Sequence, residues 1–206
     1  MTAPNPFEAL AEQIQETSTT GAVISALACL RRASAVLEVA SVGVENDVPF
    51  TRDSIASIDP QADPRSLLVP VLRAQAALAR FAADPETGEL PDDENEDRAQ
   101  LLAYVAEMVM RADADADDEV VREWADWCSS LLLDTCQHLD TLDGADPDDD
   151  RDHVPGPMTA GELQTQAEVL SLLRDSPADA MRQISELTEA TRADLLAQVA
   201  PVFGTE

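Results

Sequence analysis

Acidic side chains are the residues of this chain most able to do chemistry, and they gather in three short runs. The 206 residues include 41 Asp and Glu against 13 basic residues, all of which are arginine. Eight acids lie within 84–97, five within 113–119 and seven within 140–152. Grouped carboxylates can attract a basic surface or bind divalent cations, and such runs are also typical of solvated loops. The sequence leaves these three alternatives open.

Four residues near the middle of the chain have the spacing of half a metal site. Glu123, Trp127, Asp134 and His138 share one stripe of a helix, because steps of four and seven residues return to nearly the same face. A carboxylate near a histidine can share a metal ion with it or orient its ring as a base. One helix supplies only half of such a site. The simpler prediction is that His138 is a boundary residue hydrogen-bonded to Asp134.

Glu123 and Asp126 stand three residues apart, and this spacing resembles one half of the acidic metal motif of all-α nucleotide pyrophosphohydrolases. The second half would have to lie on another helix, but its candidate, Glu86-x-x-Glu89, falls in a proline-flanked loop. A metal-dependent all-α hydrolase is therefore an alternative function, although we predict neither a metal nor a cofactor. Its candidate ligands are Glu123, Asp126, Asp134 and His138.

The stretch expected to organise the fold is 21–44, which is apolar on nearly every face. Its many alanines and serines make a thin helix that neighbouring helices can approach closely. Only Arg31, Arg32 and Glu38 are expected to face water. Two adjacent arginines at its middle would be costly in a bilayer, so we predict a central core helix and no membrane span.

Composition and periodicity indicate an all-α protein. Aromatic residues are only 3% of the chain, and no run alternates β-branched with polar residues. We predict a bundle of about eight helices around the buried, alanine-rich central helix, with a C-terminal unit of three short helices. We expect the main bundle over 1–142, an acidic linker over 143–157, and the C-terminal unit, docked on the bundle, over 158–206.

Capping residues predict where several helices begin. Asn5-Pro6 predicts a helix to about residue 16, Thr20 is the expected cap of the central helix, and Asn95 that of another. Asp63-Pro64 predicts a further helix, with a kink at Pro70 or a start delayed to Val69. These signals depend only on neighbouring residues.

The clearest amphipathic pattern covers 118–142, where Val120 and Trp127 are predicted on the broad core-facing arc. After the linker, Thr159-x-x-Glu162 has the pattern of a capping box that opens a helix. Ser176-Pro177 predicts the next helix, and a break at Thr188 or Thr191 is expected to start the last one.

Cys29, Cys128 and Cys136 are an odd set at unrelated spacings, which indicates buried, reduced thiols and no disulfide framework. The first residues lack the charged and apolar regions of a signal peptide, so a cytoplasmic protein is expected.

The residue inventory favours a non-enzymatic function. Lysine is absent, and the chain has neither a glycine-rich phosphate loop nor a Gly-x-Ser-x-Gly motif. A field this negative repels phosphate, so direct nucleic-acid binding is not expected. A structural helical protein with a salt-adapted acidic surface is a further alternative.

We therefore predict an acidic protein–protein interaction protein that docks a basic protein partner through 84–153. It would act as an inhibitor, an immunity protein, an adaptor or a nucleic-acid mimic. The residues expected to contact the partner are Asp92, Asp93, Glu94, Asp115, Asp117, Asp118, Asp148, Asp149 and Asp150.

Overall fold

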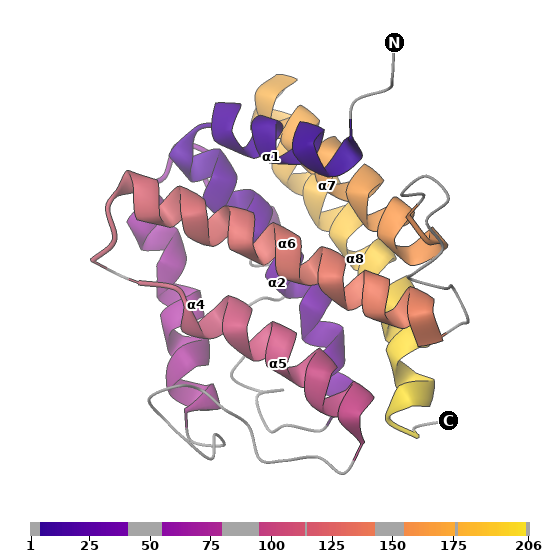
Figure 1. The fold of residues 1–206 in the computed structure, drawn as a ribbon. Helices are drawn as coiled ribbons and strands as arrows, with labels where there is room; N and C mark the ends of the chain where they lie inside the picture. The colour runs from indigo at the N-terminus through magenta and orange to yellow at the C-terminus, as the bar shows by residue number, and fades with distance from the viewer. Residues whose placement is uncertain are drawn as a thin grey trace.

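A computed structural model describes residues 5–40, 55–79, 95–113, 115–142, 155–175 and 177–204. All regular structure in these ranges is helical and the helices pack together (Figure 1), which confirms the predicted all-α class. The described helices are α1 (Pro6–Glu16), α2 (Thr19–Val39), α4 (Pro64–Leu78), α5 (Glu96–Met110), α6 (Asp118–Leu142), α7 (Pro157–Asp175) and α8 (Pro177–Val202).

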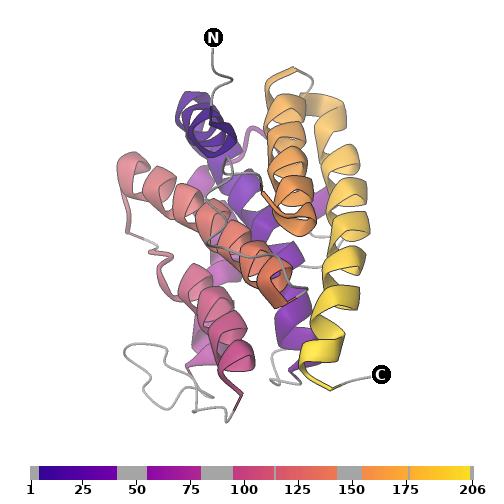
Figure 2. The same cartoon turned by 45° about the vertical axis from the view of Figure 1, so that its right-hand side comes forward.

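Helix α2 is the centre of the bundle, as predicted. It contacts α4, α5, α6, α7 and α8 and is buried over almost its whole length from Gly21 to Leu37. Figure 2 shows α5 and α6 on one side of α2 and α7 and α8 on the other. Small side chains permit this enclosure, because alanine and serine let several helices approach one backbone closely.

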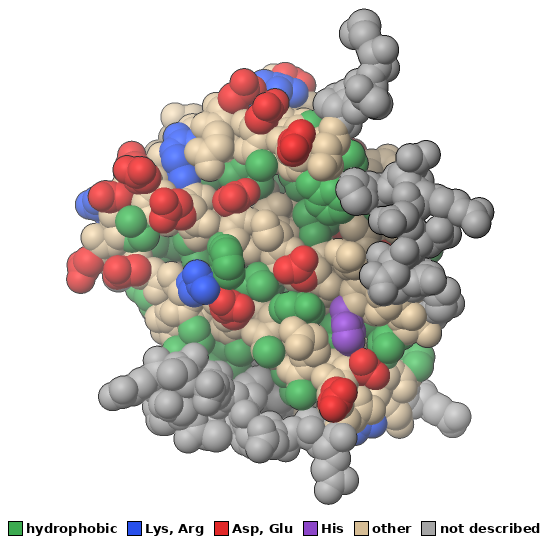
Figure 3. Space-filling view, in the orientation of Figure 1, with side chains coloured by type: hydrophobic (Ala, Val, Ile, Leu, Met, Phe, Trp, Pro, Cys, Tyr) green, Lys and Arg blue, Asp and Glu red, His purple; other side chains and the backbone are tan. Residues whose placement is uncertain are grey.

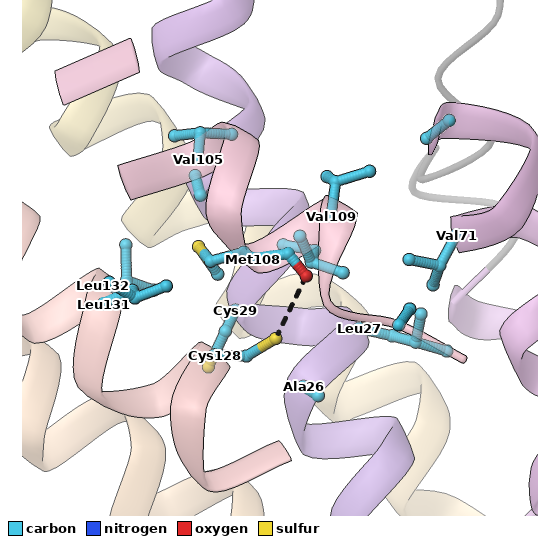
Figure 4. Close-up of a cluster of buried hydrophobic side chains, with 14 of the residues drawn as sticks. Ala26, Leu27, Cys29, Val71, Val105, Met108, Val109, Cys128, Leu131 and Leu132 are labelled. Atoms are coloured by element: carbon cyan, nitrogen blue, oxygen red, sulfur yellow. Dashed lines mark hydrogen bonds between the residues drawn. The ribbon is translucent and has the colours of Figure 1, made fainter. Parts of the chain in front are cut away.

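The largest hydrophobic cluster lies where α2 meets α4, α5 and α6 (Figure 4). Cys29 of α2 and Cys128 of α6 lie within it, and the thiol of Cys128 contacts the backbone oxygen of Met108 at 3.8 Å. All three cysteines are free and buried, as predicted. Burial raises the pKa of the Cys29 thiol to about 12 and also raises the pKa values of Cys128 and Cys136. These thiols therefore serve as packing residues.

The start of α2 differs from the prediction by two residues. Ser18 is the cap, and its hydroxyl accepts a hydrogen bond from the Gly21 backbone N–H at 3.1 Å. Thr20, the predicted cap, instead donates its hydroxyl to the backbone oxygen of Ala62 at 3.1 Å. The residue that the local pattern favoured as the cap is therefore engaged in a long-range hydrogen bond.

Arg32 was predicted to face water, but the structure buries it with only 1% of its surface exposed. Its Nε and Nη2 donate to the two carboxylate oxygens of Glu162 at 3.1 and 2.6 Å. Burial lowers the pKa of Arg32, but Glu162 together with the nearby thiols of Cys29 and Cys136 outweighs this effect, and the net pKa is raised. Gln166 extends the network, since its amide donates to Glu162 at 2.8 Å and its oxygen accepts from Ser129. The Arg32–Glu162 ion pair joins α2 to α7 through the core.

The start of α7 is capped by a residue from the preceding helix. Both carboxylate oxygens of buried Asp140 accept backbone N–H groups, from Met158 and from Thr159, each at 2.9 Å. Thr159 also donates its hydroxyl to Asp140 at 2.7 Å. The predicted capping box is therefore wrong, because Thr159 lies inside the helix and Glu162 pairs with Arg32. Gly156 leaves room for this arrangement, since a Cβ there would lie 2.4 Å from the Asp140 carboxyl carbon.

Helix α8 is one continuous helix, where the sequence predicted two. The expected break does not form, and the hydroxyl of Thr191 donates to the Leu187 backbone oxygen one turn earlier in the same helix, at 2.9 Å. Two ion pairs fix α8 to α2: Arg31 Nε lies 2.6 Å from Glu189 Oε1, and Arg192 pairs with Glu38. The described C-terminal part thus has two helices. The division into domains stays a prediction, since most of the linker lies outside the described residues.

Local signals predicted the other helix starts correctly. Asn5, Asp63 and Asn95 each accept hydrogen bonds from the first turn of α1, α4 and α5 respectively. Helix α4 begins at Pro64 and continues through Pro70, so the delayed start is wrong. No helix in the described ranges combines the length and apolar character needed to cross a bilayer.

Candidate partner-binding surface

The acidic side chains of the run 113–119 are exposed, and two of them hold the backbone where α6 begins. The side chain of Asp117 accepts hydrogen bonds from the backbone N–H groups of Glu119 and Val120, each at 3.0 Å, and so caps α6. Asp113 accepts from the backbone N–H of Asp115 at 2.9 Å. We call the following residues the acidic edge: Asp113, Asp115, Asp117, Asp118, Glu119 and Glu123, all of which are exposed.

Helix α1 and its turn into α2 adjoin the acidic edge. Thr19 donates its hydroxyl to Asp118 at 3.4 Å, and Arg122 donates to the backbone oxygens of Gln15 and Thr17. Glu16, at the end of α1, is exposed beside these contacts. Figure 3 shows acidic side chains gathered where α6 begins and again over α1. Arg122 lies among these acidic residues, and its guanidinium donates to backbone oxygens.

The structure places one of the three predicted contact groups. Asp115, Asp117 and Asp118 lie together on the acidic edge. The other two groups lie outside the described residues, and their contribution stays a prediction. They are Asp92, Asp93 and Glu94, and Asp148, Asp149 and Asp150.

Two apolar side chains on α6 were predicted to face the core but are exposed. Val120 is 42% exposed and Trp127 is 38% exposed. They lie at the margin of the apolar arc, where none of the described helices covers them completely. The guanidinium of Arg111 sits 3.9 Å from the centroid of the Trp127 ring, and it also pairs with Glu107 at 2.7 Å. The outer side of α6 therefore presents apolar surface next to the acidic edge.

Helices α5 and α6 run antiparallel (Figure 1), and several carboxylates line the seam between them. Burial raises the pKa of Asp126, and burial together with the Glu107 carboxylate raises the pKa of Asp134. Burial and the charge of Asp134 raise the pKa of Tyr104 on α5. These shifts place Glu107 and Asp134 within electrostatic reach of one another.

The predicted partner of His138 is wrong. Its Nε2 lies 3.2 Å from a carboxylate oxygen of Asp97, in the first turn of α5, rather than bonding to Asp134 on its own helix. Local spacing favoured Asp134, but packing against α5 places the Asp97 carboxylate beside this nitrogen. In the described part of the chain, no group of three His, Cys, Asp or Glu side chains is arranged to hold a metal ion. The metal candidates Glu123, Asp126, Asp134 and His138 therefore form no such group.

Part of this surface could have been found in the sequence. Glu107 and Arg111 stand four residues apart on a helix, a spacing that indicates an exposed ion pair. Their position beside Trp127 and Asp134 depends on how α5 packs on α6, for which no local signal exists. Comparisons with protein-family models, curated proteins and solved structures each returned no match. A function for this chain must therefore be inferred from its own geometry and charge.

Proposed function

We propose that this chain is a non-enzymatic interaction protein that docks a basic protein partner on the outer face of α6. The observation that carries this role is the placement of exposed Val120 and Trp127 on the side of α6 that also carries Glu119 and Glu123. Interface anchors are commonly aromatic side chains surrounded by polar groups. A partner with basic residues around an apolar contact would complement this face.

The charge of the whole molecule supports the same role. The formal net charge is −28, and the acidic edge with Glu16 contributes seven carboxylates, with Arg122 among them and Arg111 stacked on the neighbouring Trp127 ring. Such a field mainly raises the association rate and rejects acidic partners, and salt weakens it. We infer that inhibition, immunity, adaptor function or nucleic-acid mimicry would each use this docking step.

The test neutralises charge on the acidic edge without altering its shape. The triple variant D115N/D117N/D118N keeps side-chain oxygens, and asparagine at 117 can still cap α6. The matched control, D175N/D179N/E186Q, removes three charges around the junction of α7 and α8. Each protein captures partners from a lysate of the source cells at about 50 and 500 mM salt, spanning weak to strong screening, followed by mass spectrometry.

We expect a basic protein to be captured by the wild type and the control at low salt and lost in the acidic-edge variant. High salt should reduce its capture by the wild type. Changing Trp127 to alanine should weaken the same complex without changing its salt dependence, because the anchor carries no charge. An identical set of captured proteins for the wild type and the acidic-edge variant would refute docking through this edge.

A further inference from the structure

A guanidinium of the chain itself already lies on the exposed aromatic ring of the α6 outer face. Arg111, the C-cap residue of α5, has its guanidinium carbon 3.9 Å from the centroid of the Trp127 ring on α6. Its Nε and Nη2 both donate to one oxygen of Glu107, at 2.9 and 2.7 Å. Trp127 and Glu107 thus combine the two groups that bind a guanidinium most specifically, an aromatic face and a carboxylate.

The contacts of Arg111 with this ring and this carboxylate are weak enough for a competitor to replace them. Arg111, Glu107 and Trp127 are all exposed to solvent. An ion pair between exposed side chains contributes little stability, because water and salt compete for both charges. A cation over an exposed aromatic ring likewise contributes only modestly. Arg111 can therefore leave the ring without unfolding α5 or α6.

The negative charge around Trp127 exceeds what one arginine neutralises. Glu123 precedes Trp127 by one helical turn and Asp134 follows it by two turns, so all three lie on the same side of α6. Both carboxylates are exposed, and Asp134 forms no ion pair with any arginine among the described residues. Figure 3 shows hydrophobic and acidic side chains next to one another over this face. A second guanidinium that approaches the ring therefore meets net negative charge.

We propose that Trp127 and Glu107 form a receptor site for an arginine of the docked protein, and that Arg111 occupies this site until the partner displaces it. Arginine fits better than lysine, because its planar guanidinium can stack on the indole and donate to a carboxylate together, as Arg111 does. This inference rests on the docking role proposed above and adds the residue type that the partner presents. It also makes Arg111 a competitor for the site, so its removal should strengthen binding.

The test compares Arg111→Ala with a matched control on α8, Arg182→Ala. Arg182 likewise pairs with a glutamate four residues away, Glu186, at 3.0 Å, and both of these side chains are exposed. Each substitution therefore removes one positive charge and one surface ion pair. Of the two arginines, only Arg111 stacks on a described aromatic ring. A difference between the variants thus measures the effect of freeing that ring.

The probe is a short synthetic peptide of alternating alanine and arginine, and the same peptide with lysine in place of arginine is its control. Binding to the full chain is followed at about 50 mM salt, where screening is weak, through the NMR signals of the indole N–H groups. Trp127 reports on the site. Trp124 is the internal reference, because its ring is buried and its Nε1 donates to the Met108 backbone oxygen at 2.9 Å.

We expect the arginine peptide to bind the wild type more tightly than the lysine peptide, and to shift the signal of Trp127 but not that of Trp124. R111A should tighten binding of the arginine peptide by about three- to tenfold, because the ring and the carboxylate are then free. R182A should change it less than about twofold, since one charge in a net charge of −28 alters the long-range attraction only slightly. Adding R111A to W127A should give no gain, because the contested ring is gone.

Two results would overturn the inference. One is an R111A variant that binds the arginine peptide no more tightly than R182A does, and the other is an arginine peptide that binds no better than the lysine peptide. The variant D115N/D117N/D118N judges the docking role separately. If it weakened both peptides while R111A changed neither, docking on the acidic edge would hold and the arginine site would fail. If R111A tightened only the arginine peptide while the triple variant had no effect, the arginine site would hold and docking through the acidic edge would fail.

Discussion

Individual charged residues in this chain take roles that their neighbours in sequence do not indicate. Arg32 follows Arg31 directly, yet Arg31 pairs with Glu189 near the surface whereas Arg32 is enclosed with Glu162. The sequence predicted that both arginines face water, because local spacing cannot reveal a carboxylate that is 130 residues away. His138 illustrates the same limit, because the carboxylate beside it, Asp97, belongs to the neighbouring helix α5.

The stability of the protein should depend on pH through Asp134, which lies in the α5–α6 seam. Burial and Glu107 raise its pKa in the fold, so its charged form is disfavoured there. The stability contribution of this residue is therefore greatest at low pH and is lost as pH rises through the raised pKa. Asp134→Asn should raise the melting temperature at pH 7, and the gain should shrink as the pH falls towards about 4, the ordinary value for an aspartate.

The control for this variant is Glu12→Gln, which removes one charge from an exposed position on α1. Thermal melts of both variants at several pH values separate the local strain from the effect of net charge. Equal gains for the two variants at pH 7 would show that burial at Asp134 has no effect on stability.

Helix boundaries could be predicted where the determining residues are close in sequence. The bounds of α1 and α6 agree with the prediction because a cap and an apolar period are local properties. Prediction failed where a distant residue took part. Asp140 caps α7 in place of the expected capping box. Helix α8 packs against α2 and continues through Thr188 and Thr191, where a break was predicted. The acidic edge could be predicted as a charge run, but its position beside α1 could not.

The junction of α6 and α7 can be tested with two glycine substitutions of opposite sign. Gly156→Ala should destabilise the protein by about 1–3 kcal/mol, because the new Cβ would displace the carboxylate of Asp140 from its hydrogen bonds. Gly161→Ala, in open space on α7, should stabilise it by up to about 1 kcal/mol. Urea unfolding at a constant slope measures both changes. If G156A were as stable as the wild type, the Asp140 cap would contribute little.

At the scale of the whole molecule, the salt dependence of the melting temperature distinguishes a docking protein from a salt-adapted structural protein. A docking protein should fold cooperatively at low salt. Its melting temperature should level off near about 0.5 M KCl, because screening lengths are then only a few ångströms. Circular dichroism melts from low to molar KCl measure this curve. A melting temperature that climbed steadily into molar KCl would instead favour the salt-adapted structural alternative.

The central position of α2 has a consequence for synthesis on the ribosome. This apolar segment leaves the exit tunnel before α8, which packs along it, has been made. Nascent α2 must therefore wait until the helices between them have been synthesised before this neighbour arrives. Contacts between segments so distant in the chain also slow folding. Holding chaperones that bind exposed apolar segments should consequently bind nascent α2.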